Sequence, residues 1–460
     1  MSSTTNIIPL LHPYLSPETN LYLVGGYVRD RLLDIESKDI DLVTTGDPYA
    51  IARRLHAEIE GTTTPIEFRR FGTVQLKVKG MNIEIVRARK ESYRPDSRNP
   101  IVSPGTLQDD ILRRDFTINC LMIKVNQPEK VIDLTRKGMD DLNNRLIRTP
   151  LDPDKTFTDD PLRMMRAVVL AAKLGFTITD ECAQAIKRNI DRMKIITPAR
   201  IRDEFQKILS ISIGAEKSPP DFKKSNEAVT RGIDLLIELG LMNCIIPELS
   251  NIQSIDKYGD YHQSDAYEHT KRTILTCEYA DPIIRLAILL YNIGKWQRKA
   301  AEPEIAQNIM QRLKFSKSEI AEVTTLVRNY ERIQKLYDKP YRPSTLNNLI
   351  NDVEPYLSQL LIIAEAEAKA LNQNNLQVML TQIQNMRNEI NRLKNFQRNG
   401  KIQLPINGSD IMEIFEIEAG TKVGLILKEV EKWIIEGEIA PGDRHTTLTR
   451  LQKYKHKGIL

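Results

Sequence analysis

The sequence predicts an α+β protein, with strands and helices mixed in an N-terminal head and a long all-α remainder behind it. In the first 150 residues, the stretches 74–78 and 83–86 alternate polar with apolar residues or are rich in β-branched residues, which is typical of strands. After about residue 155 such stretches nearly vanish. The apolar residues then recur with a helical period, on a stripe that holds Leu162, Met165, Val169 and Ala172.

The length of the chain predicts several domains, because 460 residues exceed what one hydrophobic core supports. Residues 214–226 are polar and contain prolines, which predicts a linker. Residues 370–400 are rich in Asn, Gln and charged residues, and we interpret them as a long, mostly solvated helix. We therefore expect a head (1–150), a helical neck (151–213), a helical body (227–395) and a helical tail (396–460).

The composition predicts a globular protein of the reducing cytoplasm. Hydrophobic residues make up 41% of the chain and charged residues 28%, as in ordinary soluble domains. No apolar run reaches the roughly 18 residues of a membrane span, and the N-terminus lacks the pattern of a secretory signal. The net charge of +5 does not by itself establish a nucleic-acid partner. The cysteines form no CxxC pair, which argues against a zinc site or a disulfide framework; they are Cys120, Cys182, Cys244 and Cys277.

A glycine turn followed by two aspartates predicts a site for phosphates and metal ions. Gly25 and Gly26 lie at the expected start of a helix, where backbone N–H groups suit a phosphate. Asp39 and Asp41 lie on an expected strand and point to the same face, because strand side chains alternate. Magnesium prefers a few carboxylates together with phosphate oxygens and water. The combination predicts phosphoryl or nucleotidyl transfer by a two-metal mechanism; the alternative is a plain turn beside a solvated strand edge.

A third carboxylate, Glu84, lies on the second expected strand. Beside Asp39 and Asp41 it would suit a metal site. An exposed glutamate on a strand explains the sequence equally well, so Glu84 is a candidate metal ligand only.

The segment 113–119, RRDFTIN, contains residue types that bind phosphate and sugar. The guanidinium groups of Arg113 and Arg114 can grip phosphate oxygens in bidentate fashion. Asp115 and Asn119 could hold ribose hydroxyls. Alternatively, Asp115 pairs with an arginine for purely structural reasons.

The segment 159–166, DDPLRMMR, begins the first long helix and contains a candidate base-reading pair. Asp160 and Arg163 are three residues apart and so share a helix face. A carboxylate accepts hydrogen bonds and a guanidinium donates them, so such a pair can read the edge of a base. The alternative is that Asp160 caps the helix, with Pro161 at its first position and Arg163 as its partner.

Two basic segments are candidates for RNA or phosphate contact. Residues 87–106 lie between the strands and RRDFTIN, and we interpret them as a mobile lid near the site. Residues 444–457 could follow an RNA backbone. The alternatives are a solvated loop and an ordinary basic terminus. The cations involved are Arg87, Arg89, Lys90, Arg94, Arg98, Arg444, Arg450, Lys453, Lys455 and Lys457.

Taken together, these motifs resemble those of the class II tRNA nucleotidyltransferases, the CCA-adding enzymes, and their relatives the bacterial poly(A) polymerases. The resemblance implies a polymerase-β-like head with a mixed sheet, followed by all-α neck, body and tail. It implies that Asp39 and Asp41 bind two magnesium ions, and that residues 87–106 form the flexible loop that A addition requires. Asp159 stands where the family has Glu. The implied nucleotide-binding set is Gly25, Gly26, Arg29, Arg113, Arg114, Asp115, Asn119, Asp160, Arg163 and Arg166.

The body resembles the HD-type helical domain of many bacterial members, in a degenerate form. His269 and the frame around residues 289–295 fit that domain. Its metal-binding His-Asp pair is replaced by Tyr291 and Asn292, which cannot supply an imidazole and a carboxylate. The resemblance therefore implies the fold of this domain without its phosphohydrolase activity.

The activity implied is template-independent addition of CCA to the 3′ end of tRNA from CTP and ATP, with release of pyrophosphate. The alternatives are an enzyme that adds only A, a bacterial poly(A) polymerase and a non-catalytic tRNA-binding protein. The expected partners are tRNA, CTP and ATP, with neither membrane nor zinc. The sequence leaves the oligomeric state open.

Overall fold

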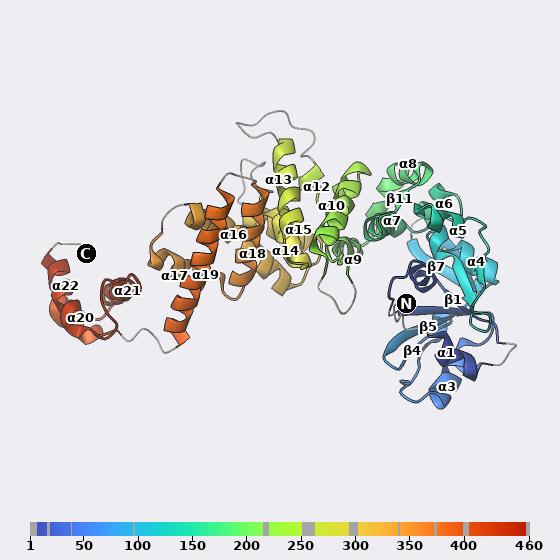
Figure 1. Cartoon of the computed structure of the whole chain (residues 1–460), viewed down its shortest axis with the longest axis horizontal. Coiled ribbons are helices and arrows are strands. Elements are labelled where there is room, and N and C mark those ends of the chain that lie inside the picture. The colour runs from blue at the N-terminus through green and yellow to red at the C-terminus, as the bar shows by residue number, and fades with distance from the viewer. Residues whose placement is uncertain are drawn as a thin grey trace. The chain divides into compact units, whose positions relative to one another are not determined.

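The computed structural model describes residues 7–15, 19–37, 39–94, 97–214, 220–250, 263–293, 302–338, 341–371, 375–398 and 404–456. By their internal contacts these residues form two compact units. The first comprises the described parts of 1–211, 227–253 and 312–315, and the second those of 212–226, 254–311 and 316–460. Figure 1 shows strands grouped in the N-terminal part of the chain and helices throughout the remainder.

The centre of the head is a seven-stranded mixed sheet in the order β3-β4-β5-β2-β1-β8-β9. Strands β2 and β5 are parallel, and every other neighbouring pair in this sheet is antiparallel. The predicted α+β head with a mixed sheet is therefore confirmed. The strands are β1 (Leu21–Val24), β2 (Asp39–Thr44), β3 (Ile66–Phe68), β4 (Thr73–Val78), β5 (Met81–Arg87), β8 (Leu121–Lys124) and β9 (Val131–Asp133).

One face of this sheet is buried under α2 (Gly26–Leu32) and α3 (Pro48–Glu58). It carries the apolar alternate residues of the central strands, among them Ile40, Leu42, Ile83 and Ile85. The opposite face is covered only in part, where α4 (Leu107–Leu112) and the following segment pack on the cluster around Val24 and Met122. The uncovered part of that face carries the candidate carboxylates.

The rest of the head and the neck surround this sheet with short elements and helices. Strands β6 and β7 pair with each other as a separate antiparallel hairpin, and β10 pairs with β11. Helix α6 packs on α8, and α7 packs on α9. The elements are α1 (Ile8–Leu11), η1 (His12–Tyr14), η2 (Arg69–Phe71), β6 (Arg89–Arg94), β7 (Ser97–Pro104), η3 (Thr117–Asn119), α5 (Gly138–Asn143), β10 (Leu146–Ile147), α6 (Pro153–Asp159), α7 (Leu162–Leu174), β11 (Thr177–Ile178), α8 (Asp180–Asn189), η4 (Ile190–Ile195), α9 (Pro198–Leu209), α10 (Phe222–Glu238), α11 (Met242–Ile245) and α12 (Pro247–Ser250).

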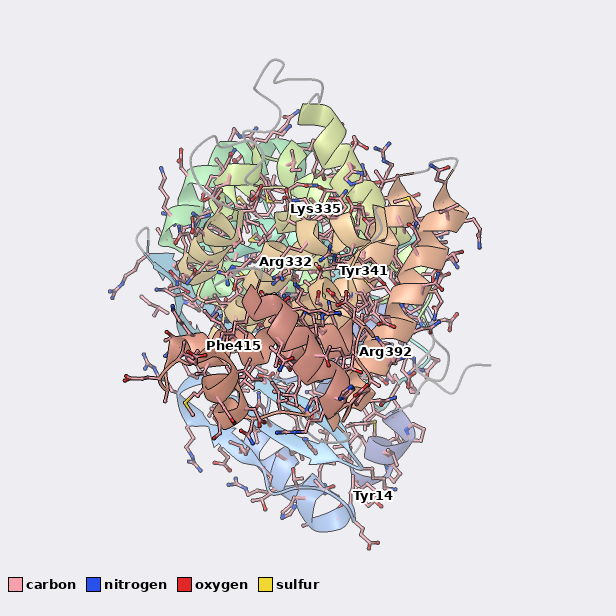
Figure 2. The ribbon with its side chains drawn as sticks, turned by 90° about the vertical axis from the view of Figure 1, so that its left-hand side faces the viewer. Tyr14, Arg332, Lys335, Tyr341, Arg392 and Phe415 are labelled. Atoms are coloured by element: carbon pink, nitrogen blue, oxygen red, sulfur yellow. The ribbon has the colours of Figure 1, made fainter. Side chains whose placement is uncertain are left out.

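The second unit is helical throughout its described residues. Arg332 of α16 pairs with Asp352 of α17. Arg392 of α19 pairs with Glu389 and donates to the Ile435 carbonyl of α21. Figure 2 labels Arg332 and Arg392 among the side chains. The helices are α13 (Gln263–Thr276), α14 (Pro282–Leu290), α15 (Glu302–Arg312), α16 (Lys317–Asp338), α17 (Pro343–Val353), α18 (Leu357–Ala370), α19 (Leu376–Arg398), α20 (Gly408–Phe415), α21 (Thr421–Ile435) and α22 (Arg444–His456).

The expected long helix in residues 370–400 is present as α19, and a capping box formed by Asn407 and Asp410 begins α20. The expected linker over 214–226 is too long, because α10 already begins at Phe222. Residues 227–253 belong to the first unit and not with the rest of the expected body; the division into four parts stays a prediction. Within the described residues, no helix is both long and apolar enough to cross a bilayer.

Candidate active site

Strand β2 presents the two aspartates on the uncovered face of the sheet. Asp39 is the register partner of Asn82 on β5, and Asp41 is the partner of Glu84. Because adjacent strands lie about 4.8 Å apart, Glu84 is a direct neighbour of Asp41. These carboxylates line a cavity of about 700 Å³. The sequence predicted that Asp39 and Asp41 share one face. The register of β2 with β5 places Glu84, the candidate third carboxylate, next to Asp41.

The glycine turn brings a positive charge against Asp41. Gly25 follows β1 with φ +72°, and a Cβ built on it would lie 3.1 Å from both Arg114 Nη1 and Asp41 Oδ2. Only glycine fits there, because the left-handed backbone and the close approach both exclude a side chain. The Arg114 Nε is buried and has no hydrogen-bond partner among the described residues. An unsatisfied guanidinium donor beside a carboxylate cluster suits an incoming phosphate.

Asp41 and Glu84 hold their protons more tightly than ordinary carboxyl groups. Burial raises the pKa of Asp41; the Arg114 guanidinium opposes this rise, and the neighbouring Asp39 adds to it. Burial also raises the pKa of Glu84, the charge of Asp41 raises it further, and a hydrogen bond from Gln75 opposes the rise. A cation between the carboxylates would reverse these effects.

The donor set fits magnesium bound together with a substrate. Among the described residues, no group of three His, Cys, Asp or Glu side chains is placed to hold one ion. Magnesium is commonly held by one or two carboxylates, with water and substrate phosphates completing its shell. Asp39 and Asp41 supply that minimum, and the cavity leaves room for phosphates. Glu84 stays a candidate, since it already accepts a hydrogen bond from Gln75.

Metal binding should depend on pH because of the raised pKa of Asp41. A metal binds the ionised carboxylate, so a proton held to higher pH competes with it. We expect the affinity for Mn²⁺, used as a probe, to fall as the pH is lowered, starting above the ordinary aspartate pKa of about 3.9. Calorimetric titration from pH 8 down to pH 4 measures this. An affinity that begins to fall only at or below the ordinary aspartate pKa would contradict the raised pKa.

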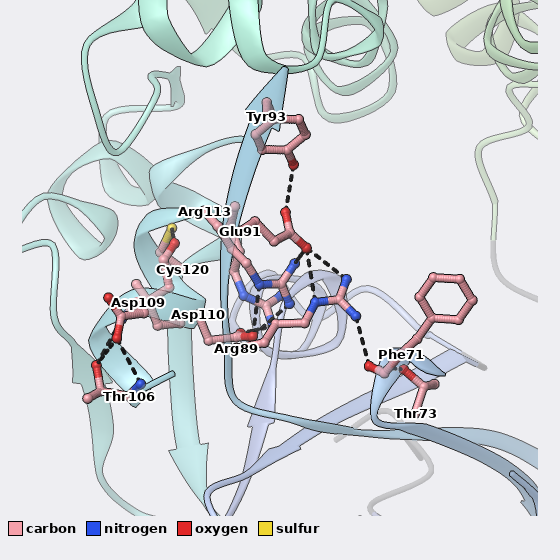
Figure 3. Close-up of polar contacts among 12 residues, drawn as sticks. Phe71, Thr73, Arg89, Glu91, Tyr93, Thr106, Asp109, Asp110, Arg113 and Cys120 are labelled. Atoms are coloured by element: carbon pink, nitrogen blue, oxygen red, sulfur yellow. Dashed lines mark hydrogen bonds and ion pairs between the residues drawn. The ribbon is translucent and has the colours of Figure 1, made fainter. Parts of the chain in front are cut away.

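The first arginine of RRDFTIN is engaged within the protein. Arg113 donates through Nε and Nη2 to Asp110 Oδ1, at 2.9 and 2.6 Å, and through Nη1 to Glu91 Oε1 at 3.1 Å (Figure 3). Asp110 is completely buried and also accepts from Arg114 Nη2 at 3.1 Å. Of the two arginines, Arg114 is therefore the one that faces Asp41. The role of both in binding a nucleotide stays a prediction.

Asp115 is the centre of a second buried network. Its Oδ1 accepts from Asn119 Nδ2 at 2.9 Å, and its Oδ2 accepts from Arg166 at 2.8 and 2.6 Å. Arg29, buried in α2, donates to Asn119 Oδ1 at 2.7 Å and to Asp30 Oδ1. Although burial alone would raise it, the Arg166 charge and the Asn119 hydrogen bond hold the pKa of Asp115 far below its usual value. Asp115 therefore pairs with an arginine, Arg166, while a role in holding ribose hydroxyls stays a prediction.

Asp160 and Arg163 do not form the expected pair on one helix face. Asp160 follows the last residue of α6, and its Oδ1 accepts from the Leu162 backbone N–H at 3.3 Å, at the start of α7. Arg163 is buried and donates through Nη2 to the Arg113 carbonyl at 2.6 Å. The expectation that both residues lie on one helix face was wrong. Helix α7 begins at Leu162, so Asp160 precedes the helix and does not share a face with Arg163. A role in base reading stays a prediction.

The expected lid at 87–106 is a β-hairpin, not an open loop. Strands β6 and β7 pair over residues 89–104. The base of the hairpin is fixed by Glu91, which is buried and accepts from Arg89, Arg113 and Tyr93 Oη, the last at 2.6 Å (Figure 3). Glu91 and Tyr93 were missed by sequence reasoning. The sequence signal that could have identified Glu91 is that it is an acidic residue inside a basic segment. The side chain of Arg98, another residue of this segment, lies outside the described part of the structure.

The candidate basic patch of the tail is largely paired within the tail. Arg444 pairs with Asp410, and Lys455 pairs with Glu416 at 2.8 Å. Arg450 pairs with Glu438 and lies over the Trp433 ring, 4.5 Å from its centre. Lys453 is exposed, and Lys457 lies outside the described residues. These pairings favour a structural role for most of the patch.

In the body, the position of the expected HD-type site is a buried polar cluster. His269 Nε2 lies 3.2 Å from Glu367 Oε1, and Tyr291 Oη lies 3.4 Å from Thr273 Oγ1. Tyr291 also packs its ring on Tyr330, with 4.1 Å between ring centres. Tyr291 therefore occupies the position of the expected metal-binding pair and packs there against Tyr330. The expected lack of hydrolase activity stays a prediction.

Three family profiles match consecutive parts of the chain. The poly A polymerase head domain matches residues 21–148, the "Probable RNA and SrmB-binding site of polymerase A" matches 175–212, and a tRNA nucleotidyltransferase domain 2 profile matches 296–445. The first match covers the sheet and both glycine and aspartate motifs. Residues 21–148, which carry the candidate site, are thus similar to the poly A polymerase head domain.

Similar proteins match further parts of the chain. The CCA-adding enzyme of Lactobacillus helveticus is 38% identical over 44% of this chain and 49% of its own, so the chain spans about half the length of this curated relative. The tRNA nucleotidyltransferase cca1 of Schizosaccharomyces pombe is 26% identical over 91% of this chain and 88% of its own. The Bacillus stearothermophilus CCA-adding enzyme in complex with CTP shares the fold over both entire chains, with a TM-score of 0.65 and 22% identity. The chain is therefore similar to a tRNA nucleotidyltransferase over most of its length, and to CCA-adding enzymes over part of it.

Proposed function

We propose that the protein adds CCA to the 3′ end of tRNA, from CTP and ATP and without a template. The observation that carries the proposal is the placement of Asp41 between Glu84 on one side and Gly25 with Arg114 on the other. That placement unites metal-binding carboxylates with a group that can hold the triphosphate. The similarity to enzymes named CCA-adding supports the choice of tRNA, CTP and ATP as substrates.

In the proposed reaction the terminal 3′-hydroxyl of the RNA attacks the α-phosphate in line, and pyrophosphate leaves. Two magnesium ions, held by Asp39 and Asp41, would activate the hydroxyl and stabilise the leaving group. Arg114 would neutralise phosphate charge beside Asp41. The Asp110 and Glu91 carboxylates would orient Arg113 and Arg114, since each arginine is fixed through them.

The alternatives within the family are an enzyme that adds only A and a poly(A) polymerase. The hairpin 89–104 and the DDPLR segment favour CCA addition, because a pocket that changes from CTP to ATP needs an adjustable element in contact with its base-reading residue. Tyr93 of the hairpin and Arg163 of α7 provide such a contact, at 3.5 Å. A non-catalytic role is less well supported, because both aspartates are present. We place the protein in the cytoplasm, in keeping with its four free cysteines.

One experiment tests the proposal against its alternatives. The protein is incubated with tRNAs that end at the discriminator base, at C or at CC, with each nucleotide in turn, and the products are sequenced. CCA addition predicts C, C and A in order on the three substrates. An A-adding enzyme extends only the CC end, and a poly(A) polymerase produces long A tails. No extension of any substrate would leave only the non-catalytic alternative.

Arg163→Ala is expected to weaken discrimination between nucleotides more than overall incorporation. A buried site that has lost a hydrogen-bond donor no longer rejects the wrong base as strongly. We expect the preference for CTP and ATP over UTP and GTP to fall by about tenfold or more, since one donor is worth roughly 1.4 kcal/mol or more. The measurement is kcat/KM for each nucleotide. Unchanged ratios in a folded variant would mean that Arg163 serves only to hold the Arg113 carbonyl.

A further inference from the structure

The outer edge of the head sheet exposes apolar side chains on the same face as the carboxylates. Ile66 of β3 is 60% exposed and Phe68 is 41% exposed. Register partners run from Ile66 through Gln75 and Glu84 to Asp41, so these side chains share one face. Three strand spacings separate Ile66 from Asp41, about 14 Å. Ile66 also lines the same cavity as the carboxylates.

The surroundings of this edge are cationic. The Arg69 side chain is 74% exposed and lies over the Tyr49 ring of α3, 5.5 Å from its centre. Arg70 is exposed next to it in the chain, and Lys77 is exposed on β4. The single acid of β3, Glu67, already pairs with both Arg53 and Arg69. Exposed apolar side chains interleaved with arginines match the pattern that binds single-stranded nucleic acid, in which bases stack and phosphates meet positive charge.

Phe71 enlarges this exposed edge. It follows Arg70 in η2 and is 50% exposed. Its carbonyl accepts from Arg89 Nη1 at 3.3 Å, while its ring points away from the Arg89–Glu91 ion pair (Figure 3). The turn that carries Phe71 is thus tied to the base of the hairpin through its backbone. The Arg70 guanidinium lies over the exposed ring, 5.7 Å from its centre.

The geometry of in-line attack indicates which of the two substrates lies over β3. In an in-line displacement, the attacking and leaving oxygens lie on opposite sides of the phosphorus atom. The groups that suit the triphosphate, Gly25 and Arg114, lie on the β1 side of Asp41. The attacking hydroxyl therefore comes from the opposite side, over β5, β4 and β3, where Ile66 and Phe68 are exposed.

We propose that Ile66 and Phe68, flanked by Arg69 and Arg70, form a platform on which the unpaired 3′ end of the RNA acceptor stacks as its terminal hydroxyl approaches Asp41. This inference rests on the proposed function. It adds a binding surface for the acceptor that is separate from the nucleotide-binding residues. We call it the β3 platform.

The test measures RNA binding without nucleotide or metal. The probes are an RNA hairpin with an unpaired 3′ CC overhang, carrying 2-aminopurine next to the last base, and the same hairpin with a blunt end. The variant combines Ile66→Ser with Phe68→Ser. Val378→Ser is the matched control, because Val378 is 56% exposed on α19 in the other unit. Phe68→Tyr keeps an aromatic ring, and circular dichroism checks that each variant is folded.

We expect the double variant to bind the overhang RNA about 5- to 150-fold more weakly, the range that stacking of one base spans. Binding of the blunt RNA, and the KM for CTP, should be unchanged. The 2-aminopurine fluorescence should be quenched by the wild-type protein and by Phe68→Tyr, but not by the double variant. Val378→Ser should behave as the wild type.

Three results would overturn the proposal: equal affinities of variant and wild type for the overhang RNA, equal losses for both RNAs, or a change of oligomeric state on sedimentation with overhang binding intact. The last would make β3 an edge strand that pairs with a second protein chain. Because binding is measured without catalysis, the result is independent of whether the wild type extends tRNA. Failure of extension contradicts the proposed function, while failure of overhang binding contradicts only the platform.

Discussion

Replacing Asp41 with alanine is expected to lower nucleotide incorporation by about a thousandfold or more, because metal stabilisation of the reacting phosphate is worth several kcal/mol. The affinity for tRNA should change little, since Asp41 lies in the cavity of the head and carries the charge that repels phosphate. Incorporation is measured as single-turnover addition of C to a tRNA that lacks CCA. Asp39→Ala should give a loss of the same order.

The control for this experiment is Asp191→Asn. Asp191 lies in the same unit, and its side chain is 84% exposed and paired with Lys194 at 2.7 Å. It should leave both addition and binding at wild-type values. Nucleotide incorporation at the wild-type rate by Asp41→Ala would contradict the proposed metal site at Asp39 and Asp41. The variant should also fold normally, because burial disfavours the ionised Asp41 that it removes.

Asp115→Ala is expected to cause the largest loss of stability. The substitution leaves the Arg166 guanidinium and the Asn119 amide without their acceptor in a site where Asp115 is only 7% exposed. Removing one partner of a fully buried ion pair costs about 3–5 kcal/mol of the free energy of unfolding. The loss should be smaller here, because the Arg166 side chain is 45% exposed and water can solvate its charge. The change should appear as faster hydrogen exchange in peptides from η3 and α7, measured by mass spectrometry.

The pH dependence of this loss follows from the lowered pKa of Asp115. A carboxylate whose pKa is lower in the folded than in the unfolded state adds stability above the unfolded pKa, about 3.9, and loses it as the pH falls further. The difference between wild type and Asp115→Ala should therefore be full at pH 7 and shrink below about pH 4. Asp154→Ala, which removes an exposed partner of Arg188, should stay close to wild type. If hydrogen exchange in Asp115→Ala equals that of the wild type, Asp115 does not stabilise the fold. That result would favour its predicted role as a ligand for ribose hydroxyls.

The sequence by itself determined the features that depend on local periodicity and turn chemistry. Asp39 and Asp41 share a face because strand side chains alternate, whatever the neighbouring strand is. Gly25 was identifiable as a turn residue, and its φ of +72° explains the choice of glycine. The helical character of the second part, and the start of α20 at Asn407, followed from repeats and caps within a few residues of each other.

The tertiary structure decided which charged groups are engaged and which face the cavity. Glu84 meets Asp41 only through the register of β2 with β5, and Arg163 meets the Arg113 carbonyl only through the packing of α7 on the head. The segment 87–106 was expected to be open because its composition is basic and proline-bearing; Glu91 fixes it by gathering Arg89, Arg113 and Tyr93. The local sequence pattern predicts which residue types occur and which face of an element they occupy. A buried charge needs a partner, because an unpaired charge in the interior is costly. That partner can lie far away in the sequence, so short-range periodicity does not predict it.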